Sequence, residues 1–145
     1  MHTAMTSNHC WIAVALASLL VVLTSADSDF RTKREQYQHN KRLCGKILRT
    51  PEADMVHYLG SDYPESHDAA CFIRCVSILN GAYDDQTGVN MELLHETYGG
   101  SMAMEEYAED AKDCLALRDE VECYCMKAYK PILCLKEQFK KRNVL

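Results

Sequence analysis

Two cysteines four residues apart, Cys71 and Cys75, constrain the fold of this 145-residue chain more than any other feature. Four residues make slightly more than one helical turn, so in a helix both side chains lie on one face. They are poorly placed there to bond each other, and each is expected to reach a different neighbouring segment. The potential partners are Cys44, Cys114, Cys123, Cys125 and Cys134. The sequence therefore predicts a helical scaffold locked by disulfides.

The N-terminus has the pattern of a secretory signal. An uncharged start precedes an apolar run over residues 11–23 and the small residues 24–26. The alternative, a membrane anchor, is disfavoured because so short an apolar run does not span a bilayer. We predict that residues 1–26 are a signal peptide and that residues 27–145 form one secreted, extracellular domain. In that setting disulfides are the usual state of cysteine.

Charge and motifs exclude several classes of function. The formal net charge is −5, and 17 acidic residues stand against three basic ones between Thr50 and Met126. A nucleic-acid binder would need a continuous basic face, so nucleic acid is not an expected partner, and neither is a membrane. The sequence contains no metalloprotease, serine-hydrolase, phosphate-loop or dinucleotide-binding motif. We therefore predict that the protein is not an enzyme and uses no cofactor.

Metal binding is also disfavoured. There is no Cys-x-x-Cys pair, although a zinc site could recruit His57, His67 or His95 as further ligands. The acidic loop Asp84–Gly88 invites a calcium interpretation, but its glycine is out of register with an EF-hand and the closing glutamate is missing. We predict no metal site.

Apolar residues at helical spacing, together with end signals, predict the first elements. A first helix has a frayed start and becomes regular near Leu43, reaching about Leu48. A second helix follows a capping Thr50 and Pro51 and ends at Gly60. A third helix carries the two spaced cysteines. No segment alternates with period two for long, so we do not expect a sheet.

The second half of the chain predicts three further helices. Asn90 caps a helix over 91–98, and Ser101 caps the next. Asp119 with Glu122 forms a capping-box pattern for a last helix that reaches about residue 139. Pro131 inside it is expected to kink it, because proline removes one backbone hydrogen bond.

Helical geometry separates two of the late cysteines. Cys125 and Cys134 are nine residues apart and face opposite sides of a helix, whereas Cys123 and Cys134 share a side. A last helix held between two neighbours needs the opposed pair. This favours Cys125 as structural and leaves Cys123 spare.

The cysteine spacing now carries a family resemblance. Gaps of 26, 3, 38, 10 and 8 residues separate six of the cysteines: Cys44, Cys71, Cys75, Cys114, Cys125 and Cys134. This resembles the six-cysteine signature of insect odorant-binding proteins, a family that includes pheromone-binding and general odorant-binding proteins. Cys123 is extra to that pattern. The resemblance implies an all-α fold, a compact bundle of about six helices around an apolar cavity, and the bridges Cys44–Cys75, Cys71–Cys125 and Cys114–Cys134.

The resemblance implies a secreted carrier that reversibly binds small hydrophobic molecules, odorants or pheromones, for chemosensory transport. Methionine adapts to varied ligands, and tyrosine offers a ring with one orienting hydroxyl. The predicted cavity wall consists of Met55, Tyr58, Leu59, Ile78, Leu79, Leu93, Met104, Tyr107, Ala108, Ala111, Tyr129, Ile132 and Leu135. The apolar ends of the tail, Val144 and Leu145, are expected to fold back over the opening.

Two other functions stay open on the sequence. One is a secreted helical interaction protein without a cavity, linked into a homodimer through Cys123. The other is a scavenger of amines or lipids with the same fold, in saliva or reproductive fluid. An olfactory receptor is a candidate partner for a carrier of odorants.

Overall fold

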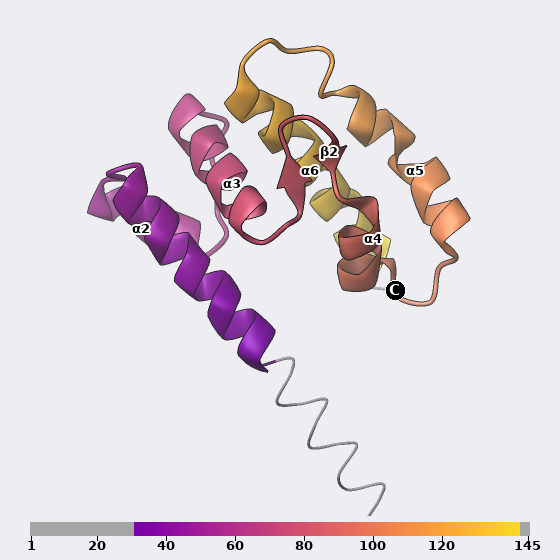
Figure 1. Ribbon diagram of the computed structural model, residues 1–145, viewed down its shortest axis with the longest axis horizontal. Coiled ribbons are helices and arrows are strands. Elements are labelled where there is room, and N and C mark those ends of the chain that lie inside the picture. The colour runs from indigo at the N-terminus through magenta and orange to yellow at the C-terminus, as the bar shows by residue number, and fades with distance from the viewer. Residues whose placement is uncertain (1–30, 143–145) are drawn as a thin grey trace, which may run out of the picture. The chain divides into compact units, whose positions relative to one another are not determined.

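The computed structural model describes residues 31–142 (Figure 1). The predicted signal peptide lies outside these residues. The chain divides into two compact units, Met1–Gln36 and Tyr37–Leu145. Of the first unit the structure describes residues 31–36, which are helical. Within residues 31–142, every helix falls short of the length and apolar character that crossing a membrane requires.

The second unit opens with three helices. They are an N-terminal helix over 37–47, α2 (Glu52–Leu59) and α3 (His67–Leu79). The α3 helix starts with a side-chain cap, because the Ser66 hydroxyl accepts a hydrogen bond from the Ala69 N–H at 3.2 Å.

The prediction that Thr50 caps α2 is wrong. The N-cap residue is Pro51, and no side-chain hydrogen bond caps this end. The Thr50 N–H instead donates to the Gly45 carbonyl at 2.9 Å, which closes the turn after the N-terminal helix. Thr50 therefore belongs to the end of one helix and not to the start of the next.

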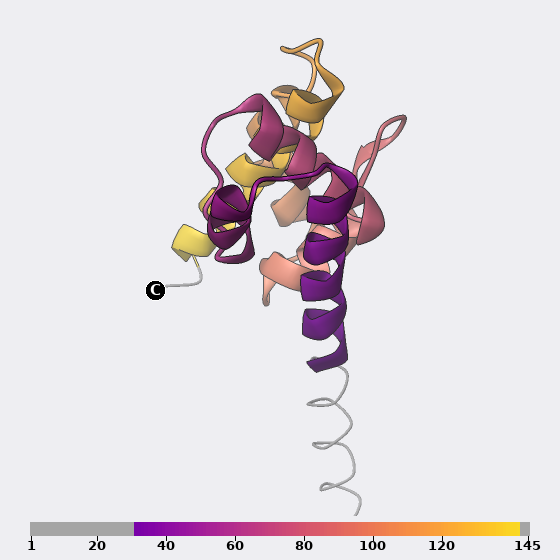
Figure 2. The ribbon, with the colours of Figure 1, turned by 90° about the vertical axis from the view of Figure 1, so that its left-hand side faces the viewer.

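A short antiparallel hairpin corrects the expectation that no sheet would form. Strands β1 (Tyr83–Asp84) and β2 (Gly88–Val89) pair with Tyr83 opposite Val89. The Asp84 carboxylate accepts hydrogen bonds from the N–H groups of Gln86 and Thr87 at 2.8 and 2.9 Å, which fixes the turn. Seen from the side, the hairpin projects away from the helices (Figure 2).

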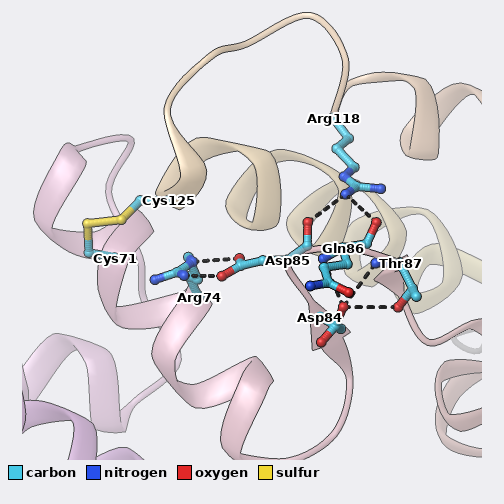
Figure 3. A network of polar contacts seen from close by, with 8 residues as sticks. All are labelled: Cys71, Arg74, Asp84, Asp85, Gln86, Thr87, Arg118 and Cys125. Atoms are coloured by element: carbon cyan, nitrogen blue, oxygen red, sulfur yellow. Dashed lines mark hydrogen bonds and ion pairs between the residues drawn. A yellow bond between two sulfur atoms is a disulfide. The ribbon is translucent and has the colours of Figure 1, made fainter.

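Two arginines tie this hairpin to the helices (Figure 3). Arg74 of α3 forms a two-pronged ion pair with Asp85, and Arg118 Nη2 donates to the Asp85 and Gln86 carbonyls at 2.8 and 3.0 Å. Gly88 has a φ of +88°, and a side chain there would meet Arg118 Nη1 at 2.9 Å. Glycine at this position serves both the turn and the close approach of Arg118.

Four elements complete the chain: α4 (Met91–Leu94), the π-helical turn η1 (His95–Gly99), α5 (Met104–Ala116) and α6 (Tyr124–Arg142). The Asn90 side chain caps α4 as predicted, accepting from the Leu93 N–H at 3.1 Å. The predicted helix over 91–98 is, however, α-helical only as far as Leu94 and then widens into η1.

Two predicted helix starts are wrong. Ser101 does not cap α5, whose N-cap is Ala103, because the preceding residues form a turn in which the Met102 N–H reaches the Gly99 carbonyl. Asp119 does not start α6 either. Its N–H donates to the Ala116 carbonyl at 3.0 Å, in the tight turn that ends α5. The last helix begins at Tyr124 and includes Pro131.

Three disulfides join four of the helices. They are Cys44–Cys75, Cys71–Cys125 and Cys114–Cys134, the pairs that the resemblance implies. The α6 helix lies against α3 on one side and against α5 and η1 on the other (Figure 1). It is bonded to α3 and α5 through its two opposed cysteines, so α6 is the element around which the unit is built.

Candidate ligand-binding site

Buried apolar side chains form two separate clusters. The first, here the α3 cluster, lies among the N-terminal helix, α2, α3 and α6 and consists of Cys44, Tyr58, Ala69, Ala70, Phe72, Ile73, Val76 and Tyr129. The second, here the α5 cluster, lies among α4, α5 and the later part of α6 and consists of Leu94, Tyr107, Ala111, Cys114, Leu135 and Phe139. The α3 cluster has a densely packed aromatic centre, with the Tyr58 and Phe72 ring centroids 4.7 Å apart.

Tyr107 is the centre of the α5 cluster. Its side chain is fully buried, and its ring stacks on Phe139 with centroids 4.2 Å apart. The His95 ring meets Tyr107 edge-on at 5.2 Å. These contacts fix the ring from two sides, so the direction of its hydroxyl is set by packing.

The Tyr107 hydroxyl is buried and has no hydrogen-bond partner among the described residues. Two other buried hydroxyls, of Tyr63 and Tyr83, also lack a partner of good geometry. Burial raises the pKa of both, but the nearby Ser61 side chain opposes this at Tyr63, and the charge of Arg118 opposes it at Tyr83. At Tyr107 nothing opposes burial, which raises its pKa to about 12 with a further contribution from Tyr98. An unpaired buried hydroxyl is rare and calls for an explanation.

The π-helical turn positions His95 against Tyr107. One His95 ring nitrogen, Nε2, lies 2.7 Å from the Met102 carbonyl oxygen and is therefore the N–H donor. Gly99 is buried under the same ring, and a side chain there would lie 2.3 Å from His95 Cδ2. Only glycine fits below this histidine. π-Helical turns occur frequently at functional sites.

Methionines surround the α5 cluster. Met91, Met102 and Met104 are partly buried and pack against it, as do Val89 and Tyr98. Methionine is unbranched and polarisable, so it adapts its shape to what it contacts. The cluster therefore combines a deformable apolar lining with one unpaired hydroxyl.

A surface pocket adjoins this cluster. Its volume is about 410 Å³, and it is lined by Gly81, Tyr83, Asp84, Thr87, Gly88, Val89, Asn90, Met91 and Glu92. Val89 and Met91 also pack against the α5 cluster, so the pocket lies on the outer side of the cluster wall. It is a more polar hollow than the predicted apolar cavity, and it is open at the hairpin.

One group of side chains is of the types that bind metal ions, but it cannot form a metal site. Ligand atoms of His67, Cys71 and Cys125 lie within 4.8 Å of one another. The two sulfur atoms are bonded to each other, so neither is the thiolate that a metal would need.

Comparison with known proteins identifies the family. Residues 27–138 match the sequence profile of the PBP/GOBP family. The chain belongs to this family. In this chain the fold consists of helices, apart from the short hairpin, and is locked by three disulfides. This confirms the predicted all-α fold class.

Individual relatives agree with this assignment. General odorant-binding protein 99a of Drosophila melanogaster is 27% identical over 119 residues, which cover 81% of this chain and 83% of that protein. The crystal structure of odorant-binding protein 22a of Anopheles gambiae with bound cyclohexanone is 26% identical, with a TM-score of 0.62 over 74% of this chain and 96% of that one. The same protein in a form described as open for ligand binding has a TM-score of 0.63, at 27% identity and with coverages of 71% and 91%.

In this PBP/GOBP protein the predicted wall residues fall into distinct groups. Tyr107, Ala111, Leu135 and Met104 belong to the α5 cluster or pack on it. Tyr58, Tyr129, Met55 and Ile132 belong to the α3 cluster or pack on it. Leu59, Leu93 and Ala108 are partly buried. Ile78 and Leu79 lie at the surface with 39% and 43% exposed. Val144 and Leu145 lie outside the described residues.

The predicted cavity wall left out Phe139 and Leu94, which belong to the α5 cluster of this PBP/GOBP protein, and His95, which contacts Tyr107 at its edge. Phe139 could have been found, because it follows Leu135 by four residues on the same helical face. Leu94 and His95 had no comparable signal. The π-helical turn shifts the side-chain register after Leu94, so faces assigned from 3.6 residues per turn no longer apply there.

Proposed function

We propose that this protein is a carrier that binds small hydrophobic molecules of the odorant type reversibly at the α5 cluster. The observation that carries the proposal is the unpaired, buried Tyr107 hydroxyl within a methionine-lined apolar cluster. Family membership supports it, and so does the cyclohexanone bound by the Anopheles gambiae relative. The proposed wall comprises Tyr107, Ala111, Leu135 and Met104, with Ala108 and Leu93 beside them.

The proposal includes secretion and transport without chemistry. The family match begins at residue 27, directly after the predicted signal peptide, which supports an extracellular domain. Within the described part of the site, the His95 donor nitrogen is used on the Met102 carbonyl and the Cys114 sulfur is in a disulfide. Neither is arranged to activate a nucleophile. Binding and release of an unchanged molecule is what these residues support.

Blocking the α5 cluster tests the proposal. The fluorescent probe N-phenyl-1-naphthylamine should bind the wild-type protein with micromolar affinity, about −8 kcal/mol. Ala111→Trp adds a large ring at a fully buried position of α5, so it should weaken probe binding at least about tenfold, roughly 1.4 kcal/mol. The control is Ala116→Trp, an exposed position at the end of the same helix, which should bind like the wild type.

Both variants are first checked for native helix content and for the three disulfides. If Ala111→Trp does not fold, Ala108→Phe places a smaller ring at a partly buried position of the same helix. Undiminished probe binding in a folded blocked variant would place the site elsewhere. Absence of probe binding in the wild type would overturn the carrier proposal itself.

A further inference from the structure

The Tyr107 hydroxyl is the one polar group in the described part of the α5 cluster that has no protein partner. The cluster's other heteroatom, the Cys114 sulfur, is bonded to Cys134. At its edge, His95 uses Nε2 on the Met102 carbonyl at 2.7 Å. The hydroxyl is held in a fully buried position by rings on two sides and cannot turn to water. An apolar molecule in this cluster would leave it unsatisfied, which is unfavourable.

The chemistry of this hydroxyl restricts what can satisfy it. Burial raises the pKa of Tyr107 to about 12, so the group keeps its proton at neutral pH and is available as a donor. Besides burial, the influence on this pKa comes from Tyr98. A carboxylate that met only this neutral hydroxyl would be a buried anion without a cationic partner, which is strongly disfavoured.

We propose that the site selects small neutral molecules with one carbonyl-type oxygen on a hydrocarbon body, and that the Tyr107 hydroxyl donates a hydrogen bond to this oxygen. The hydrocarbon part lies among Phe139, Leu94 and the three methionines. The inference rests on the proposed carrier function and names the ligand class of the same site. Tyr107 is then the residue that determines specificity.

Three probes of nearly the same size separate the possibilities. Acetophenone carries a carbonyl oxygen, α-methylstyrene has a methylene group in its place, and benzoate is anionic. Each competes with N-phenyl-1-naphthylamine for the wild-type protein, for Tyr107→Phe and for Tyr83→Phe. Tyr83→Phe is the matched control, because it removes a different buried hydroxyl without a partner. Tyr83 belongs to the lining of the surface pocket beside the hairpin, here the hairpin pocket.

The wild type should bind acetophenone more tightly than α-methylstyrene, and benzoate most weakly. Tyr107→Phe should reduce the affinity for acetophenone about three- to tenfold and leave α-methylstyrene unchanged, because one hydrogen bond is lost without a change of shape. Tyr83→Phe should change neither. Removal of an unpaired hydroxyl should not lower the thermal stability of ligand-free Tyr107→Phe, so the comparison is made on a folded protein.

Equal affinities of wild type and Tyr107→Phe for acetophenone would overturn the inference while leaving the carrier function standing. An equal loss for acetophenone and α-methylstyrene would do the same, since it would show a packing effect. A selective loss in Tyr83→Phe would move the recognition of the oxygen to the hairpin pocket. If no probe binds the wild type, both the inference and the proposed function fail.

Discussion

Lys41 is fully buried, and its ammonium group covers the C-terminal end of α2. Nζ donates to the Tyr58 carbonyl at 2.8 Å, to the Leu59 carbonyl at 3.3 Å and to the Ser61 hydroxyl at 2.9 Å. A cation at this end of a helix is favourable, and three oxygens satisfy its three donors. No carboxylate of the described chain forms an ion pair with it; besides these oxygens, Nζ lies over the rings of Tyr37 and Tyr63, 5.1 and 5.4 Å from their centroids.

This arrangement predicts a stability that rises with pH. Burial, with a contribution from Lys136, lowers the pKa of Lys41 to about 8 from 10.5. Between those values the unfolded chain holds more protons than the folded one, so raising the pH from 7 to 9.5 should stabilise the fold by at most about 2 kcal/mol. Urea unfolding at both pH values, for the wild type and Lys41→Met, measures this contribution as the difference between the two proteins.

Subtracting the pH dependence of Lys41→Met from that of the wild type removes the contributions of the other titrating groups. Tyrosines whose pKa is raised in the fold, such as Tyr58 and Tyr63, act in the opposite direction as the pH approaches 10. Their effect is common to both proteins. Parallel pH profiles of wild type and Lys41→Met would show that the lysine keeps its ordinary pKa in the fold.

At the scale of elements, η1 decides whether the proposed site keeps its shape. Gly99→Ala would drive a methyl group into the His95 ring, whose nearest atom would lie 2.3 Å away. The ring is held by Tyr107 and by the Met102 carbonyl, so it cannot yield freely. We expect a destabilisation of about 1–3 kcal/mol, as for other overpacked sites, and weaker probe binding.

A double-mutant cycle distinguishes a clash from a general loss of glycine. If the ring is the obstacle, Gly99→Ala should be much less destabilising in a His95→Ala background than in the wild type. Urea midpoints with the disulfides intact provide the four values. The same destabilisation in both backgrounds would point to backbone conformation as the cause.

The sequence predicted elements with strong local signals and missed those set by tertiary contacts. Asn90 acts as a cap, and α2 ends at Leu59, next to the predicted stop at Gly60. The hairpin was missed because each strand has two residues, too few for alternation to be read. Its position depends on Arg74 and Arg118, which lie 11 and 33 residues from Asp85 in the sequence. Asp119 resembled a helix start, but backbone hydrogen bonds assign it to the end of α5.

The proposed site could be predicted in part for the same reason. Tyr107 and Ala111 lie four residues apart on α5, and this spacing alone placed them on one face. Ile78 and Leu79 had the same apolar character, yet they lie at the exposed end of α3. Periodicity identifies an apolar face but does not show which neighbour covers it.

For the whole molecule, the disulfides close chain segments with sequence separations of 31, 54 and 20 residues. Each is expected to contribute about 3–4 kcal/mol by restricting the unfolded chain. Cys123 is the unpaired cysteine of the described chain and is partly buried. It precedes α6 by one residue, two positions from the bonded Cys125.

We predict that Cys123 is the one thiol of residues 27–145 that reacts with a maleimide without prior reduction. Intact mass should show one label on the wild type and none on Cys123→Ser, with equal probe binding. Any dimer of the wild type that dithiothreitol dissociates should also be absent from the Cys123→Ser protein. Labelling of Cys125 or Cys71 in the unreduced protein would mean that Cys123 has taken part in a bridge.

The bridges leave one long stretch of chain without a cross-link, the 38 residues between Cys75 and Cys114. The hairpin, α4, η1 and most of α5 lie in it, and so do Tyr107 and all three methionines that line the α5 cluster. The cysteines that cross-link the fold and the residues of the proposed site are therefore largely different residues. If the proposed site is correct, substitutions within this one segment would alter ligand preference while the cross-linked frame stays the same.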